Sequence, residues 1–165
     1  MSESGRLARV VLEENSTASL PPFLEADRAQ AVADLATASR FVPLAVRQPQ
    51  NHAGPYALRL AIRDGRLIFD IRCDNEHPLT AIGVALAPFR SLIKDYQLLV
   101  DSHMKAVQEG RLERIQAIDM GRRGLHNEGA ELMQRRLHDK IDIDFDTARR
   151  LFTLLCVLYQ RVSVR

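Results

Sequence analysis

Residues 119–136, DMGRRGLHNEGAELMQRR, gather side chains that could bind an anion or transfer a proton. The guanidinium groups of Arg122 and Arg123 can each bind two oxygens of a phosphate or carboxylate. His126 could act as a general acid or base, because the pKa of an imidazole lies near neutral pH. The candidate catalytic residues are His126 and Glu128, and the candidate ligand-binding residues are Arg122, Arg123, His126, Asn127 and Glu131.

The spacing predicts a helix over 111–138 that carries charge on its apolar side. Asp119, Arg122 and His126 are spaced i, i+3 and i+7, so in a helix they form one stripe among apolar residues. A charge on a buried stripe destabilises the fold unless it is paired. Three interior glycines each destabilise a helix by about 1 kcal/mol relative to alanine; they are Gly121, Gly124 and Gly129. Such departures from helix rules indicate a functional or strained site.

Two alternatives stay open for this segment. Gly121 and Gly124 could end one helix, so that Asn127 begins another whose free backbone N–H groups hold an anion. The charges could instead form a structural network of ion pairs that ties this helix to the last one. The pairs expected in that network are Asp119–Arg122 and Glu131–Arg135.

Alternating aspartates at 142, 144 and 146 do not complete a calcium-binding loop. Thr147 would stand where that loop needs glycine, and Thr153 where it needs a bidentate glutamate. Asp146 is instead expected to cap the last helix. The sequence contains no zinc-protease, nucleophile-elbow, P-loop or dinucleotide-binding motif, so we expect neither a metal nor a cofactor.

The composition suits one globular domain of 165 residues with a formal net charge of +2. The 20 arginines against 3 lysines indicate either oxyanion recognition or the codon usage of a GC-rich genome. Nucleic-acid binding is not expected, because acidic residues interleave with the basic ones over 109–146 and tryptophan is absent. We expect residues 1–5 to be disordered and 47–55 to form a loop.

The compartment is expected to be the cytoplasm. Cys73 and Cys156 form no CxxC pair, and the first 20 residues lack the apolar core of a secretory signal. The longest apolar run is too short to span a bilayer, so no membrane association is expected.

Residues 56–72, YALRLAIRDGRLIFDIR, predict a β-hairpin with a two-residue turn at Asp64 and Gly65. That turn pairs Arg63 with Arg66 and brings apolar residues together on one face. The predicted apolar pairs are Ile62–Leu67, Leu60–Phe69 and Leu58–Ile71, and Arg59 faces Asp70 on the other side.

Periods of 2 and 3.6 residues predict the remaining elements. The expected strands are 6–13, 41–46, 79–87 and 141–146, and the expected helices are 23–39, 88–110, 111–139 and 147–161. This order predicts an α+β fold. Its antiparallel sheet of about four to five strands, including the Asp-Gly hairpin, would pack against three C-terminal helices and one N-terminal helix.

Four stretches also carry a resemblance: AIDMGRRGLHNEGAELMQRRLHDKIDIDFDTARRLFTLLCVLY, GPYALRL, RLIFDIR and PFRSLIKDYQLLVDSH. They are similar to a small uncharacterised protein family of alphaproteobacteria, over nearly the whole chain and most weakly in the first 50 residues. The resemblance implies a bacterial, cytoplasmic, single-domain protein. It carries over no catalytic residue, cofactor or partner.

Three hypotheses about function follow. The first is a non-enzymatic binding or regulatory module that recognises a phosphate, a carboxylate, a phosphorylated small molecule or an acidic protein through 119–136; the absence of nucleophile and metal motifs favours it. The second is a small enzyme that acts on a phosphate ester or nucleotide, with His126 as general acid or base. The third is a structural protein in which the charges are buried and paired. An enzyme requires a pocket lined by these residues.

Overall fold

The computed structural model describes residues 4–14, 20–44 and 53–163, and it contains the predicted hairpin in the predicted register. Strands β3 (Tyr56–Arg63) and β4 (Arg66–Cys73) pair antiparallel across a turn in which Asp64 and Gly65 both have positive φ. This turn geometry twists the two strands in the sense that a sheet requires. Local sequence is therefore enough to specify this pairing.

The α+β class is confirmed, but the main sheet is mixed rather than wholly antiparallel. Its strand order is β1–β3–β4–β5, in which β1 (Leu7–Leu12) runs parallel to β3 and β5 (Pro78–Ala85) runs antiparallel to β4. The parallel pair is reached through helix α1 (Pro22–Thr37), a crossover of the length that parallel neighbours need. The short strands β2 (Phe41–Pro43) and β6 (Ile141–Ile143) pair separately as a second sheet.

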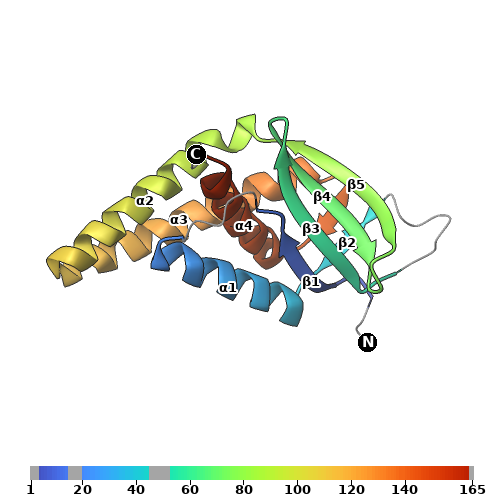
Figure 1. The fold of residues 1–165 in the computed structure, drawn as a ribbon, viewed down its shortest axis with the longest axis horizontal. Helices are drawn as coiled ribbons and strands as arrows, with labels where there is room; N and C mark the ends of the chain where they lie inside the picture. The colour runs from blue at the N-terminus through green and yellow to red at the C-terminus, as the bar shows by residue number, and fades with distance from the viewer. Residues whose placement is uncertain (1–3, 15–19, 45–52, 164–165) are drawn as a thin grey trace.

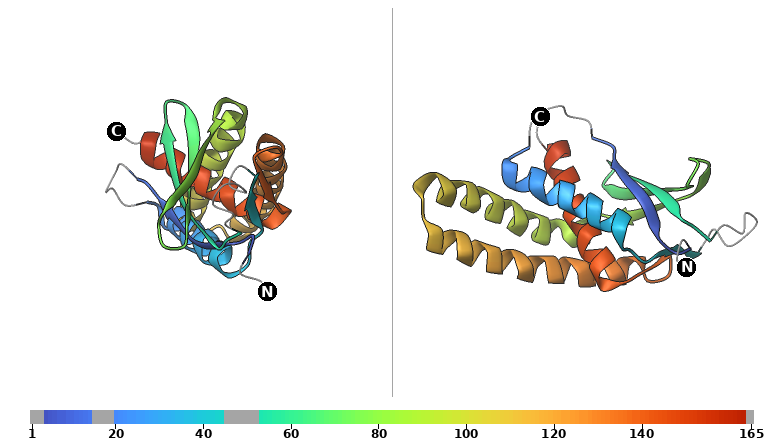
Figure 2. Two further views of the ribbon diagram at one scale, coloured as in Figure 1. Left: turned by 90° about the vertical axis from the view of Figure 1, so that its right-hand side faces the viewer. Right: turned by 90° about the horizontal axis from the view of Figure 1, so that it is seen from below.

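The helices lie on one side of the main sheet (Figure 1). After a 3-10 turn (η2, Ala87–Phe89), helix α2 (Arg90–Glu109) ends at Gly110, whose φ of 66° closes the helix as predicted. Helix α3 (Leu112–Leu137) returns beside α2, and this long hairpin projects away from the sheet (Figure 2). Helix α4 (Phe145–Ser163) packs against α1, α3 and β3, so it forms the centre of the fold.

The last helix begins earlier than predicted, and its capping residue is Asp144 rather than Asp146. The Asp144 carboxylate accepts a hydrogen bond of 2.9 Å from the backbone N–H of Thr147. The backbone oxygen of Asp144 accepts the N–H of Ala148 at 3.0 Å. Asp146 therefore lies in the first turn of α4. Both aspartates suit a cap, and the position at which β6 ends decides between them.

Parts of three predictions fall outside the described residues. The strand expected at 41–46 is described only to residue 44, and most of the 47–55 loop and of the 1–5 segment is not described. Gly5, which is described, donates a backbone hydrogen bond to Ala53 and accepts one from Phe41. Within the described segments, no helix has both the length and the apolar composition to cross a membrane.

Candidate functional site

The segment 119–136 lies within a single unbroken helix, α3. The alternative in which glycines end one helix and Asn127 begins another is therefore wrong. Gly129 has a packing role, because a Cβ atom there would lie within 2.5 Å of three ring atoms of Phe152 on α4. The missing side chain lets α3 and α4 approach closely. Gly124, by contrast, faces open space.

Arg122, Arg123 and His126 line one pocket, which the enzyme hypothesis requires and which a binding module can also use. The pocket has a volume of about 290 Å³ and lies between α1, α3 and α4. Helix α1 contributes Asp27, Gln30, Ala31 and Asp34, and helix α4 contributes Arg149, Arg150 and Thr153.

Asp27 binds two partners and joins α1 to the long helical hairpin. Its Oδ1 accepts a hydrogen bond of 2.7 Å from Nη1 of Arg122, and its Oδ2 accepts the hydroxyl of Tyr96 on α2. The Asp27 side chain is only 14% exposed, so this ion pair is largely shielded from solvent. Burial, together with the Asp27 carboxylate, raises the pKa of the Tyr96 phenol far above its ordinary value. The guanidinium of Arg122 also lies 5.3 Å from the ring centre of Phe23.

Asp34 lies about two turns further along the same face of α1, and both of its carboxylate oxygens also have partners. Its Oδ1 accepts a hydrogen bond of 2.8 Å from the side-chain amide of Gln30. Its Oδ2 lies 3.3 Å from Nε of Arg150 on α4. The two pocket carboxylates therefore each hold one arginine, and each has both oxygens occupied.

Arg123 and Arg149 complete the cationic lining without such partners. Among the described residues, neither guanidinium forms a hydrogen bond or an ion pair with a carboxylate. Arg123 is exposed and Arg149 is half-buried, so they line the pocket at different depths. Four arginines thus face two aspartates, and the pocket carries an excess of positive charge.

His126 forms part of the buried wall of the pocket. His126 is only 7% exposed, and its ring stacks on the ring of Tyr96 with the two ring centres 5.7 Å apart. Its Nε2 lies 3.4 Å from the hydroxyl of Thr153. Burial, followed by the charges of Arg122 and Arg149, lowers the pKa of His126 to about 4. The imidazole is therefore neutral at physiological pH.

The remaining candidates on α3 lie elsewhere. Asn127, Glu128 and Glu131 are exposed and do not line the pocket. Of the two expected ion pairs, Asp119 lies 4.0 Å from Arg122, whereas within the described part of the chain Glu131 forms no ion pair with Arg135. The main partner of Arg122 is on α1 rather than on the last helix.

Sequence reasoning missed the acidic wall of the pocket. Asp27 and Asp34 are spaced i and i+7 on α1, with Ala31 between them, so one helical stripe carries all three. This spacing is a signal that could have identified them. Arg149 and Arg150 are visible in the sequence only as an adjacent basic pair, because nothing local links them to α1. No group of three or more metal-ligating side chains is assembled anywhere in the described ranges.

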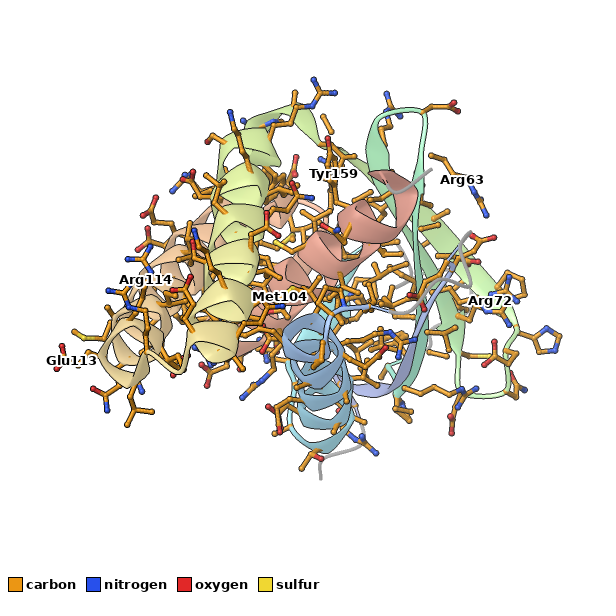
Figure 3. The ribbon with its side chains drawn as sticks, turned by 60° about the vertical axis from the view of Figure 1, so that its left-hand side comes forward. Arg63, Arg72, Met104, Glu113, Arg114 and Tyr159 are labelled. Atoms are coloured by element: carbon orange, nitrogen blue, oxygen red, sulfur yellow. The ribbon has the colours of Figure 1, made fainter. Side chains whose placement is uncertain are left out.

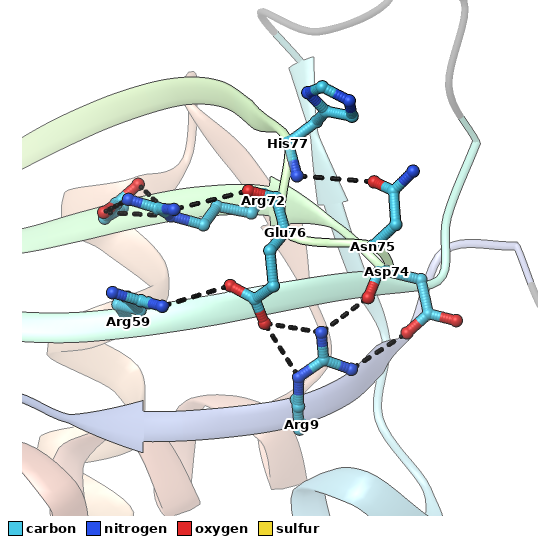
Figure 4. Close-up of polar contacts among 8 residues, drawn as sticks. Arg9, Arg59, Arg72, Asp74, Asn75, Glu76 and His77 are labelled. Carbon is cyan, nitrogen blue, oxygen red and sulfur yellow. Dashed lines mark hydrogen bonds and ion pairs between the residues drawn. The ribbon is translucent and has the colours of Figure 1, made fainter.

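A second cluster of arginines lies on the outer face of the sheet. Arg9 on β1 binds Asp74 at 3.0 Å and also binds Glu76, which Arg59 contacts at 3.3 Å (Figure 4). Arg72 binds Asp70 at 3.1 Å. Arg63 pairs with Glu13 nearby. Figure 3 shows Arg63 and Arg72 on the sheet side of the molecule, opposite Glu113 and Arg114 at the tip of the α2–α3 hairpin.

The fold and the pocket together define an α+β protein with an arginine-lined pocket among three helices. The chain belongs to the Uncharacterised protein family (UPF0262), whose model matches residues 4–161. It is 61% identical over 162 residues to a UPF0262 protein of Granulibacter bethesdensis, covering 96% of this chain and 92% of that relative. A UPF0262 protein of Acidiphilium cryptum is 55% identical over 161 residues, covering 95% and 94%.

With a more distant relative, the similarity still covers almost all of both sequences. A UPF0262 protein of Maricaulis maris is 46% identical over 164 residues, which is 99% of both chains. No solved structure matches this chain significantly. The resemblance expected from the sequence is therefore confirmed, and the bacterial family it indicated is the right one.

Proposed function

We propose that this protein is a non-enzymatic binding module that recognises an anionic group in the pocket between α1, α3 and α4. The observation that carries the proposal is the charge imbalance of the lining, in which Arg123 and Arg149 have no carboxylate partner among the described residues. Uncompensated guanidinium groups in a concave site repel one another, and an anion relieves that repulsion. Arg122 and Arg150, held by Asp27 and Asp34, would stabilise the walls.

The state of His126 supports binding rather than acid–base catalysis. A general acid or base works best when its pKa lies near the operating pH. A pKa of about 4 leaves His126 neutral at pH 7, so it has no proton to donate as an imidazolium and is only a weak base. Its ring is buried against Tyr96, and Nε2 faces the hydroxyl of Thr153. Glu128, the other candidate for proton transfer, is exposed outside the pocket.

Thermal unfolding with added anions tests the proposal. The panel would contain phosphate, citrate, nucleotides and a short nucleic acid. A ligand that binds only the folded state raises the midpoint of unfolding, by an amount equivalent to about 2.7 kcal/mol at a hundredfold excess over Kd. We expect at least one small anion to raise the midpoint of the wild type and to have no such effect on Arg123→Ala.

Arg63→Ala is the matched control, because it removes an arginine from the outer face of the sheet and leaves the pocket intact. Its midpoint should rise with the anion as the wild type's does. The proposal is wrong if no anion raises the wild-type midpoint, or if Arg123→Ala responds as the control does.

A further inference from the structure

The charged side chains that lack partners in the pocket are hydrogen-bond donors. All four carboxylate oxygens of Asp27 and Asp34 have a donor or cation beside them. The guanidinium groups of Arg123 and Arg149 have no acceptor among the described residues. The Nε atom of Arg122 is also buried without a hydrogen-bond acceptor there, whereas that of Arg150 lies beside Asp34. A ligand that complements these guanidinium groups must present hydrogen-bond acceptors, as the terminal oxygens of a phosphate group do.

The charge of the pocket distinguishes between kinds of anion. Among the side chains that line the pocket, four arginines against two aspartates leave an excess of two positive charges, since the buried His126 adds none at neutral pH. Asp119, 4.0 Å from Arg122, lies outside this lining. A phosphomonoester carries a charge of about −1.5 to −2 at pH 7. A carboxylate or a phosphodiester carries a single charge and would neutralise only half of the excess. The balance favours the monoester.

The directions of the donors also suit a tetrahedral group. Arg123 comes from α3 and Arg149 from α4, two helices that cross rather than run side by side (Figure 2). The hydroxyl of Thr153 on the same α4 wall already donates a hydrogen bond of 3.1 Å to the backbone oxygen of Arg149, so the guanidinium groups are the donors left for a ligand. Donors on different walls can reach different oxygens of a phosphate, whereas the two oxygens of a carboxylate lie in one plane.

The size of the pocket limits the part of the ligand that it can enclose to a small group. Its volume of about 290 Å³ lies at the lower end of the range typical of ligand pockets. Arg123 is exposed, which places it at the mouth, so the group esterified to the phosphate can extend there into solvent.

Building on the proposed anion site, we propose that its ligand is a small phosphomonoester, whose phosphate dianion is bound between Arg123 and Arg149. Phosphodiesters and simple carboxylates would bind much more weakly. Inorganic phosphate presents the same oxygens and would bind the same donors. Comparing the affinity for phosphate with the affinities for its methyl esters distinguishes the two ligands.

Calorimetric titration at pH 7.5 with methyl phosphate, dimethyl phosphate, inorganic phosphate and acetate tests this ligand class. Methyl phosphate and dimethyl phosphate share the tetrahedral group but differ by one charge. We expect methyl phosphate to bind at least about tenfold more tightly than dimethyl phosphate or acetate, as the loss of one charge-assisted contact would give. Tighter binding of inorganic phosphate than of methyl phosphate would overturn the ester as ligand.

Two variants test whether methyl phosphate binds in the pocket, and a third removes an arginine from the sheet face as a control. Arg123→Gln and Arg149→Gln should each weaken methyl phosphate binding by about tenfold or more, and Arg63→Gln should leave it unchanged. Equal affinity for methyl phosphate, dimethyl phosphate and acetate, lost in the pocket variants, would overturn the phosphomonoester while leaving the anion site standing. Absence of binding by every anion would overturn both.

Discussion

Arginines gather in two regions of this molecule, and the two regions differ in how many of the arginines are paired. Among the described residues of the sheet face, the exposed Arg66 beside Arg63 has no carboxylate partner, whereas the other four arginines do. On the outer face of the sheet Arg9, Arg59, Arg63 and Arg72 each contact a carboxylate, and these pairs lie in or near solvent. In the pocket between α1, α3 and α4, two arginines are paired and two are not. Arginine thus forms ion pairs on the surface of the sheet, and in the pocket it leaves guanidinium donors without acceptors.

The difference shows that arginine abundance is a poor guide to a site, and that pairing is a better one. The high arginine content of the sequence had two explanations, oxyanion recognition and codon usage. Codon usage is enough to explain the arginines of the sheet face, because exposed ion pairs contribute little to stability. The pocket supports the first. Three experiments compare matched residues in the two regions.

The largest expected effect is the pH dependence of stability that His126, buried in the pocket wall, contributes. His77, which is exposed beside the arginine pairs of the sheet face, serves as the comparison. The folded pKa of His126, about 4, lies below its ordinary value of 6.5. Above pH 6.5 the residue makes no contribution to pH dependence. Between pH 6.5 and 4 the unfolded chain takes up the proton first, so the free energy of unfolding falls by up to about 3 kcal/mol. Below about pH 4 the loss is complete.

Denaturant unfolding of the wild type, His126→Gln and His77→Gln across this pH range measures that contribution. The difference between wild type and His126→Gln should shrink from neutral to acid pH, and His77→Gln controls for the same substitution at an exposed position. Parallel profiles for wild type and His126→Gln would show that His126 titrates normally and that the pocket wall is wetter than described.

A middle-sized effect is expected from the two kinds of ion pair. Arg122→Ala leaves the shielded Asp27 carboxylate without its guanidinium, so it should lower the free energy of unfolding by about 2 kcal/mol. Arg63→Ala breaks a pair that is more than half exposed on both sides and should change it by less than about 1 kcal/mol. Urea unfolding at pH 7 measures both. Equal losses would remove the distinction between the regions.

The smallest effect compares two glycines. Gly129→Ala places a methyl group against the buried ring of Phe152 and should destabilise the protein by about 1 kcal/mol net, after the better helix propensity of alanine is counted. Gly83→Ala on β5 meets the flexible side chain of Arg66 at 3.3 Å and should be close to neutral. Thermal melting of both variants, with Gly124→Ala as the open-space reference, gives the ranking. A neutral Gly129→Ala would mean that α3 and α4 can separate without penalty.

The local parts of the fold could be predicted from the sequence. The Asp64-Gly65 turn and the alternating strands specify the hairpin register, and Gly110 specifies the end of α2. The parallel pairing of β1 with β3 could not be predicted, because a crossover has no short turn that identifies the two strands as neighbours. Asp144 and Asp146 both suit a cap, and only the end of β6 selects Asp144.

The candidate site was predicted in part for the same reason. Arg122 and His126 were identifiable because they interrupt an apolar stripe on α3, and both line the pocket. Asn127, Glu128 and Glu131 are near them in sequence but turn to another face of the helix. Asp27 lies 95 positions from Arg122, and no local pattern reports a contact over that separation.

The distance in sequence between the pocket residues also determines when the pocket can form during synthesis. Its walls come from residues near 27–34, 122–126 and 149–153, so no anion can be held until the start of α4 has been made and has packed on α1. Contacts of such long range form late in folding. A ligand bound there would slow the unfolding of the finished protein rather than speed its folding. The pocket therefore distinguishes a chain with α4 in place from one still being synthesised.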